Sequence, residues 1–167
     1  MRHTKLGSAS HNGILLDIGC GANKQQGFMG MDKRKLAGVD IVHDLEKFPY
    51  PLEDNSCHVI MGSHIIEHIK PWLTIALFNE LWRIMKPKGQ LVLSTPYAGS
   101  PGFWQDPTHC NGFSQVTFQY FDPDYPLYEI YRPKPWKIEP GFPQYVINGN
   151  LEAMMRKRDE KSNKRLH

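Results

Sequence analysis

The chain of 167 residues has few features of secreted or membrane proteins. No apolar run approaches the roughly twenty residues that a membrane-spanning helix needs, and residues 1–12 lack the apolar core of a signal peptide. Three cysteines, Cys20, Cys57 and Cys110, are widely spaced and form no Cys-x-x-Cys pair, so we expect neither a disulfide framework nor a structural zinc site. These absences favour the cytoplasm, where thiols stay reduced.

The chain also has little excess of positive over negative charge. The formal net charge is +3, and much of it falls in a mixed run of basic and acidic side chains from Arg156 to Arg165. A run of this kind is typical of a solvated tail, and the mild charge elsewhere gives little support to phosphate binding. We expect a flexible lead-in over residues 1–12, a single domain over residues 13–156 and a charged tail over residues 157–167.

Short apolar runs between turn-forming residues predict the strands of a mainly parallel sheet. In the first hundred residues the expected strands are 14–18, 28–31, 39–42, 57–61 and 90–94. Leucines at helical spacing predict a helix over Pro71–Met85, which the Lys86-Pro87-Lys88-Gly89 run would end. Further along we expect a short helix at 114–121, strands at 136–139 and 151–155, and a tight turn at Asn148-Gly149.

The links between the first three strands are too short for ordinary helical crossovers. About nine residues separate Gly19 from Phe28 and about six separate Asp32 from Val39, whereas a parallel crossover takes about ten to twelve residues or more. We therefore expect these crossovers to be trimmed to a turn or a loop. One face of the sheet should then be thinly covered at these strands.

The first strand runs directly into Asp17-Ile18-Gly19-Cys20-Gly21, and the next two strands are followed by Asp32 and Asp44. A Gly-x-Gly turn lets the backbone approach a ligand where a Cβ would collide. Because parallel strands end at one edge of a sheet, we expect a nucleotide-like ligand there. Lys24 holds the last position of a Gly-x-Gly-x-x-Gly fingerprint, which disfavours NAD. The same residues would also suit a tight turn and the capping of turns.

The run His64-Ile65-Ile66-Glu67-His68 matches the His-x-x-Glu-His motif of a class of zinc peptidases. That chemistry needs one long helix with both histidines on a single face, and a distant third ligand. Here the run follows an apolar strand directly and Pro71 would end a helix early. We interpret the run as a strand end and expect no metal site. His68 is more simply explained as a packed or capping side chain.

The order and spacing of these segments resemble the class I S-adenosylmethionine-dependent methyltransferases. The resemblance runs from about Ile14 to Phe121 and implies an α/β, Rossmann-like sheet, mostly parallel, with trimmed early crossovers and an antiparallel C-terminal strand. Asn23 stands where the family usually has a third glycine, and asparagine tolerates left-handed backbone better than most residues. The short early links and residues 104–109 resemble a small subgroup, some of whose members act in sugar and surface-polysaccharide pathways.

The resemblance implies S-adenosylmethionine as the cofactor. The positions that it implies for cofactor binding are Asp17, Gly19, Cys20, Gly21, Asp32, Asp44, Leu45, Ser63, His64 and Ile66. The glycines would approach the methionyl carboxylate, and Asp17 would steady the loop or contact the amino group through water. Asp32 would accept hydrogen bonds from both ribose hydroxyls. Asp44 would bind the adenine amine with Leu45 beside the ring, and His64 and Ile66 would line the sulfonium side.

Residues 97–143 are rich in proline, glycine and aromatic side chains, and we expect them to cover the substrate side of the domain. Methyl transfer depends mainly on alignment, and a base helps where the acceptor is a hydroxyl or a protonated amine. His109 is the first candidate for that base, with Asp106 orienting it or binding the acceptor and Tyr97 lining the acceptor pocket. Equally, Asp106-Pro107 could begin a turn and His109 could hold the loop.

The resulting hypothesis is a methyltransferase that acts on a small molecule, such as a sugar or polysaccharide precursor. A non-catalytic protein that retains the fold is one alternative. A nucleic-acid methyltransferase is the other, and the absence of Asn/Asp-Pro-Pro-Tyr after the fourth strand disfavours it. We expect a small-molecule acceptor as partner and no membrane. The sequence carries no signal for an oligomeric state.

Overall fold

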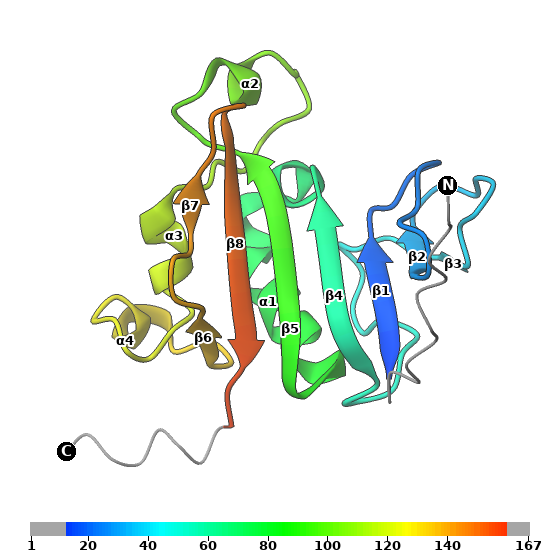
Figure 1. Cartoon of the computed structure of the whole chain (residues 1–167), viewed down its shortest axis with the longest axis horizontal. Helices are drawn as coiled ribbons and strands as arrows, with labels where there is room; N and C mark the ends of the chain where they lie inside the picture. Colours follow the sequence, from blue (N-terminus) through cyan, green and yellow to red (C-terminus); the bar gives the residue numbers. More distant parts are fainter. Residues whose placement is uncertain (1–12, 160–167) are drawn as a thin grey trace, which may run out of the picture.

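An eight-stranded sheet forms the centre of the computed structural model, which describes residues 13–159 (Figure 1). The strands are β1 (Ile14–Ile18), β2 (Met29–Asp32), β3 (Ile41–Val42), β4 (Cys57–Ser63), β5 (Met85–Pro96), β6 (Trp136–Ile138), β7 (Gln144–Tyr145) and β8 (Asn150–Lys157). Their order is β3-β2-β1-β4-β5-β8-β6, and β7 pairs with β8 away from this path. The expected lead-in at residues 1–12 and the tail from residue 160 onward lie outside the described residues.

The sheet has the predicted mixture of strand directions. Strands β1 to β5 pair in parallel with one another, whereas β8 runs antiparallel to β5, β6 and β7. No helix interrupts the described links from β1 to β2 and from β2 to β3. The expected fold class, including its trimmed early crossovers and antiparallel C-terminal strand, is therefore confirmed.

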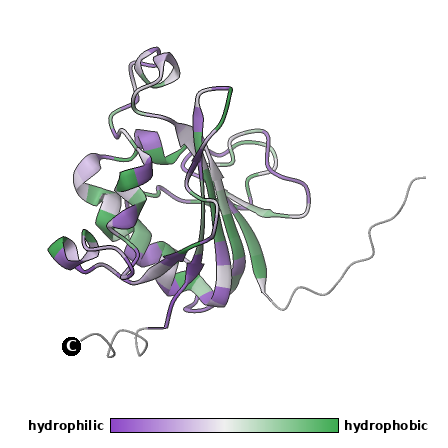
Figure 2. Cartoon of the chain, turned by 60° about the vertical axis from the view of Figure 1, so that its left-hand side comes forward, coloured by the Kyte–Doolittle hydropathy of each residue, from purple (hydrophilic) through white to green (hydrophobic). Residues whose placement is uncertain are grey.

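The helices gather on one side of the sheet, as Figure 2 shows. They are α1 (Thr74–Ile84), α2 (Pro101–Trp104), α3 (Gln115–Gln119) and α4 (Tyr128–Tyr131), together with the 3-10 turns η1 (Ile66–His68) and η2 (Pro71–Leu73). Helix α1 buries Leu77, Phe78 and Leu81 against the sheet, as its leucine spacing predicts. Among residues 13–159, no helix has the length and apolarity to cross a bilayer.

The two faces of the sheet differ in burial. Side chains alternate between the faces of a strand, and Leu16, Ile18, Ile60, Leu91 and Leu93 are buried on the helix side. Their neighbours along the strands are only partly buried, and these are Leu15, Val59, Met61, Val92 and Met154. Figure 1 looks onto this second face, over which no helix lies. The missing crossover helices explain its exposure.

Element boundaries depart from the sequence prediction at several points. Met85 begins β5 instead of ending the helix, and Lys88, with φ of 63°, lies inside the residue range of that strand. Strand β8 continues to Lys157, the first residue of the expected tail. The short elements β7, α2 and α4 were not predicted, because two to four residues carry too little periodicity to identify them.

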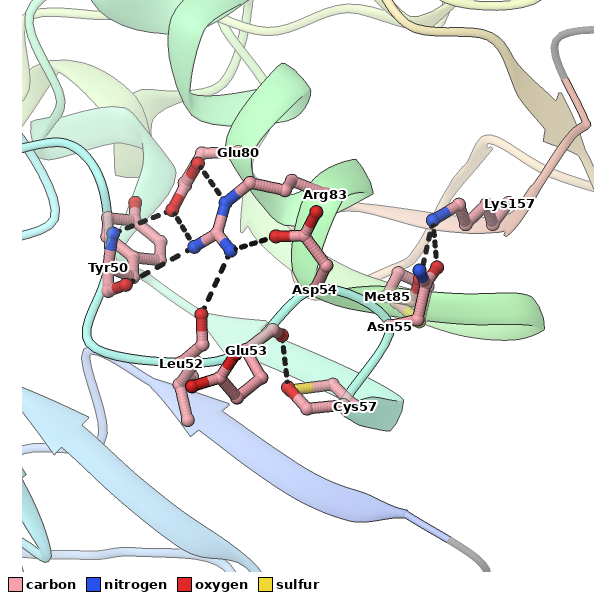
Figure 3. Close-up of polar contacts among 11 residues, drawn as sticks. Tyr50, Leu52, Glu53, Asp54, Asn55, Cys57, Glu80, Arg83, Met85 and Lys157 are labelled. Carbon is pink, nitrogen blue, oxygen red and sulfur yellow. Dashed lines mark hydrogen bonds and ion pairs between the residues drawn. The ribbon is translucent and has the colours of Figure 1, made fainter.

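Polar contacts tie the link between β3 and β4 to helix α1 (Figure 3). Glu80 accepts hydrogen bonds from the Tyr50 backbone N–H, at 2.6 Å, and from two nitrogens of Arg83. Arg83 also donates to the Leu52 carbonyl at 2.9 Å and pairs with Asp54. Burial alone would raise the pKa of Glu80, but the hydrogen bonds outweigh it and the pKa lies below its ordinary value. The network fixes where the chain enters β4.

Candidate active site

A cavity of about 610 Å³ opens where the central parallel strands end. It lies beside β1 and β4, where the strand order changes direction and open α/β sheets bind their ligands. Five of the residues expected to bind the cofactor line it: Gly19, Asp32, Asp44, Leu45 and His64. Because the sheet order is β3-β2-β1-β4-β5, the aspartates lie on the β2 and β3 side of this cavity and His64 on the β4 side.

The glycine turn after β1 is closely packed by the chain itself. Gly19 has φ of 65°, and a Cβ there would lie 2.3 Å from Cγ1 of Ile65. Gly21 has φ of 56°, and its N–H donates to Oδ2 of Asp32 at 2.9 Å. Asn23 does not adopt the left-handed conformation, and its N–H instead donates to the Cys20 carbonyl at 3.2 Å. The turn therefore needs no glycine at the third position.

Asp17 and Cys20 support this turn from within the protein and do not line the cavity. Oδ2 of Asp17 accepts the Gln25 N–H at 2.8 Å, which holds the following loop. Burial raises the pKa of Asp17, and this hydrogen bond offsets only part of the rise. Burial likewise raises the pKa of the Cys20 thiol, which points at the Gly21 carbonyl. Gly21 also lies outside the cavity lining.

Asp32 presents a buried carboxylate at the end of β2. Oδ1 accepts the backbone N–H of Arg34 at 2.8 Å and its Nε at 3.1 Å, while Oδ2 accepts from Gly21. Burial opposes ionisation of Asp32, but these hydrogen bonds outweigh it and the pKa lies below its ordinary value. The carboxylate is thus charged at neutral pH and serves as an acceptor. The Arg34 side chain that covers it is 61% exposed.

The segment after β3 forms the next part of the cavity wall. Oδ1 of Asp44 accepts a hydrogen bond from the Glu46 N–H at 3.1 Å. The Leu45 carbonyl accepts a hydrogen bond from the Tyr50 hydroxyl at 2.9 Å, which holds Leu45 in place. Glu46 in turn accepts both the backbone N–H and the ammonium of Lys70, at 2.9 and 2.8 Å. These contacts tie the segment to the chain that follows β4, across the cavity.

The segment after β4 places its residues in three different surroundings. His64 has φ of 53°, a conformation that is uncommon for residues other than glycine and that often marks functional sites. Its Nε2 accepts from the Asn150 side chain at 3.0 Å. Ser63 is exposed outside the cavity lining, and Ile66 is 1% exposed within the hydrophobic core. The His-x-x-Glu-His run forms a strand end and the 3-10 turn η1, not a long helix.

Glu67 lies in the chain between Ile65 and His68, which line the cavity, but is not part of the lining itself, and the sequence does not predict it as a site residue. Its side chain is fully buried, and Oε2 accepts the Thr95 hydroxyl at 3.0 Å. Oε1 has no hydrogen-bond partner among the described residues and lies 3.4 Å from Nδ1 of His64. The only signal for Glu67 in the sequence is its position in the His-x-x-Glu-His run, which we interpreted as a strand end without a metal site.

The three residues predicted to serve the acceptor do not all come together. His109 lies beside Glu67, with Nε2 3.9 Å from Oε1, and Asp106 Oδ2 is 3.8 Å from the same Nε2. Oδ1 of Asp106 accepts the Thr108 N–H and hydroxyl, which hold the Asp106 pKa below its ordinary value. Tyr97 instead packs its ring 5.4 Å from that of Tyr145. None of the three predicted residues is itself part of the cavity lining, although Thr108, between Asp106 and His109, is.

Comparisons with known proteins agree on the fold. A SAM-dependent methyltransferase from Archaeoglobus fulgidus is 18% identical, with 88% of this chain and 87% of that chain covered and a TM-score of 0.63. A protein from Pyrococcus horikoshii is 16% identical over 90% and 84%, with a TM-score of 0.61. A SAM-dependent methyltransferase from Methanosarcina mazei is 13% identical over 86% and 91%, with a TM-score of 0.54.

Comparison by sequence finds no match. No protein-family model matches the chain, and no curated protein matches it. The evidence for a shared fold is therefore the strand order with its antiparallel C-terminal strands, together with the similarity to solved structures over most of the length of both chains. The protein has the fold of the class I S-adenosylmethionine-dependent methyltransferases.

Proposed function

We propose that this protein transfers a methyl group from S-adenosylmethionine to a small-molecule acceptor. The observation that carries the proposal is the cavity at the strand ends. Asp32, the last residue of β2, and Asp44, which follows β3, line this cavity together with Gly19 and Leu45. The fold supports the choice of cofactor, since solved structures with this fold include proteins described as SAM-dependent methyltransferases. The cavity is large enough for a ligand of this size.

The β2 and β3 side of the cavity suits the adenosyl group. Asp32 is a charged acceptor that can take both ribose hydroxyls once the Arg34 side chain moves away. This movement is cheap, because Arg34 is 61% exposed and an ion pair with such a partner contributes only about 0–1 kcal/mol. Asp44 would accept the adenine amine, and Leu45 would contact the ring.

The β4 side of the cavity suits the reacting centre. When bound, S-adenosylmethionine supplies a methyl group already activated on a sulfonium. The acceptor atom would form a bond to the methyl carbon as the carbon–sulfur bond breaks, and the electron pair of the broken bond would stay on sulfur. His64 and His68 line this side, with His109 directly behind His68 at a ring separation of 4.8 Å.

His109 is suited to take the proton of an acceptor hydroxyl. Its Nδ1 lies 2.8 Å from the Phe103 carbonyl, which only accepts, so Nδ1 carries the hydrogen and Nε2 keeps its lone pair. Asp106 lies near Nε2 and would stabilise the protonated ring. A sugar hydroxyl needs such a base, whereas a neutral amine does not. This arrangement supports an acceptor of the sugar or polysaccharide-precursor class.

Calorimetric titration with S-adenosylmethionine and S-adenosylhomocysteine tests the cofactor assignment. If Asp32 holds the ribose, Asp32→Ala should weaken both ligands by about 1–3 kcal/mol, or roughly 5- to 150-fold in Kd. Asp54→Ala is the matched control, because Asp54 is an exposed carboxylate that precedes β4, at the other end of the strands. Failure of the unaltered protein to bind either ligand, or equal affinity of the Asp32 variant, would refute the assignment.

A methyl-transfer assay separates the proposal from its two alternatives. Formation of S-adenosylhomocysteine with a panel of sugars and sugar nucleotides supports the proposed activity. Cofactor binding without transfer to any acceptor in a broad screen would indicate a non-catalytic protein that retains the fold. Transfer to DNA or RNA, with binding that weakens steeply as salt rises, would indicate a nucleic-acid methyltransferase.

A further inference from the structure

We propose that Glu67, His68 and His109 form a binding site for a divalent transition-metal ion on the acceptor side of the cavity. Each of the three side chains offers one ligand atom, and these atoms all lie within 4.8 Å of one another. Two of the residues come from the turn η1 after β4, and the third comes from the segment after β5. The site departs from the sequence-based expectation of no metal, because only the fold brings His109 to the other two residues.

The unpartnered oxygen of Glu67 is the strongest independent sign of a missing ligand. Glu67 is fully buried, yet Oε1 has no hydrogen-bond partner among the described residues. Leaving a buried carboxylate oxygen unsatisfied is costly, so such an atom calls for an explanation. Oε1 faces Nε2 of His109 at 3.9 Å and Nδ1 of His64 at 3.4 Å. A cation between Glu67 and His109 would satisfy it.

The ligand side chains are already oriented by outer contacts, as in many metal sites. Thr95 donates its hydroxyl to Oε2 of Glu67 at 3.0 Å, which leaves Oε1 for a metal. The Phe103 carbonyl accepts from Nδ1 of His109 at 2.8 Å and leaves the Nε2 lone pair free to coordinate. Nδ1 of His68 lies 3.0 Å from the Thr108 hydroxyl. Each ligand thus has a partner that fixes its rotation.

The donor set indicates which metals fit. Two imidazoles and one carboxylate suit Zn²⁺, Co²⁺, Fe²⁺ or Mn²⁺, whereas Mg²⁺ and Ca²⁺ prefer oxygen ligands throughout. Ligand atoms about 2.1 Å from one Zn²⁺ are at most about 4.2 Å apart, so the three side chains need to close in by small rotations. His68 and Thr108 line the cavity, which leaves the remaining coordination positions open to an acceptor.

The metal would deepen the proposed methyl transfer, and this part of the inference rests on the proposed function. An acceptor hydroxyl bound to the metal has a lowered pKa and releases its proton to water. The resulting alkoxide oxygen forms the bond to the methyl carbon, the carbon–sulfur bond breaks, and the electron pair remains on sulfur. With metal bound, Nε2 of His109 is a ligand and no longer the base.

Metal binding can be measured without cofactor or acceptor. Protein freed of metal with a chelator, which is then removed, is titrated with Zn²⁺ by calorimetry and with Co²⁺ by visible absorption. We expect one site with a Kd in the micromolar range or tighter, and a Co²⁺ spectrum that saturates at one equivalent. Glu67→Gln, His68→Ala and His109→Ala should each weaken binding at least about tenfold. His58→Gln is the matched control, because His58 is an exposed histidine on β4.

The histidines outside residues 13–159 could also bind metal, but they are the same in every variant. A difference in metal affinity between a cluster variant and the control therefore reports on the cluster. Circular dichroism identifies any variant that fails to fold, and His68→Ala, at a partly exposed residue, then decides the test. The proposal is overturned if the unaltered protein binds neither metal more tightly than millimolar, or if the cluster variants bind as it does. Calorimetry with S-adenosylhomocysteine on the same samples shows separately whether the proposed function survives.

Discussion

Replacement of Gly19 by alanine tests how the turn after β1 is built. The structure gives this glycine two separate reasons to lack a side chain. Its φ of 65° is a left-handed conformation, and a Cβ would lie 2.3 to 2.7 Å from three carbon atoms of Ile65. Both Gly19 and Ile65 line the cavity, so the substitution probes packing at the site itself.

The two reasons have different magnitudes and can be separated. Left-handed backbone costs an alanine about 1–2 kcal/mol. The collision with Ile65 involves its β carbon as well as its flexible end, and overpacking of this kind costs about 1–3 kcal/mol. Gly19→Ala should therefore lower the free energy of unfolding by about 2–5 kcal/mol. Gly27→Ala is the matched control, because Gly27 has φ of 85° and nothing within 4 Å of its would-be Cβ.

Urea denaturation followed by circular dichroism measures both variants. We expect the control to lose about 1–2 kcal/mol and Gly19→Ala to lose clearly more, with an unchanged slope. The additional substitution Ile65→Ala removes two of the three colliding atoms, so the double variant should lose less than the sum of the single losses. Equal losses for Gly19→Ala and Gly27→Ala would show that Ile65 does not press on this turn.

Two further substitutions test contacts that hold the fold together. Glu80→Gln should cost about 1.5–3 kcal/mol of unfolding free energy at neutral pH, because it weakens the charged contacts with Arg83. The pKa of Glu80 is lower in the folded protein than its ordinary value of 4.5, so the stabilisation from its charge is complete above pH 4.5 and is lost as the pH falls through the folded-state pKa. The urea midpoints of the variant and the unaltered protein should therefore converge in acid. A gap between them that stays constant with pH would contradict this expectation. Ser114→Ala removes the capping box of α3, in which Ser114 and Thr117 hydrogen-bond reciprocally. It should lower the free energy of unfolding by about 1 kcal/mol in the same assay. An unchanged urea midpoint would show that the cap contributes nothing.

The sequence contained most of the information about where strands end and little about what packs around those ends. Asp32 and Asp44 could be placed at the cavity because short apolar runs locate parallel strands and acidic residues follow them. The helix over 74–84 was predictable for the same reason, since its leucines repeat at helical spacing. These are local signals, and they do not depend on distant contacts.

The remaining features depend on contacts between residues far apart in the chain. Glu67 is recognisable as a site residue only once Thr95 and His109 lie beside it. Arg34 follows Asp32 closely, but no local pattern indicates that its guanidinium folds back onto that carboxylate. Strand β7 is two exposed residues long and exists because β8 offers an edge to pair with. Such features follow from tertiary packing, which residue patterns do not record.

A crystal structure with S-adenosylhomocysteine bound is the most direct test of the central claim. The account predicts that the ribose hydroxyls lie within hydrogen-bond distance of Asp32, with Arg34 displaced, and that the adenine lies beside Leu45 with its amine at Asp44. Binding of the ligand elsewhere, with Arg34 still on Asp32, would contradict it.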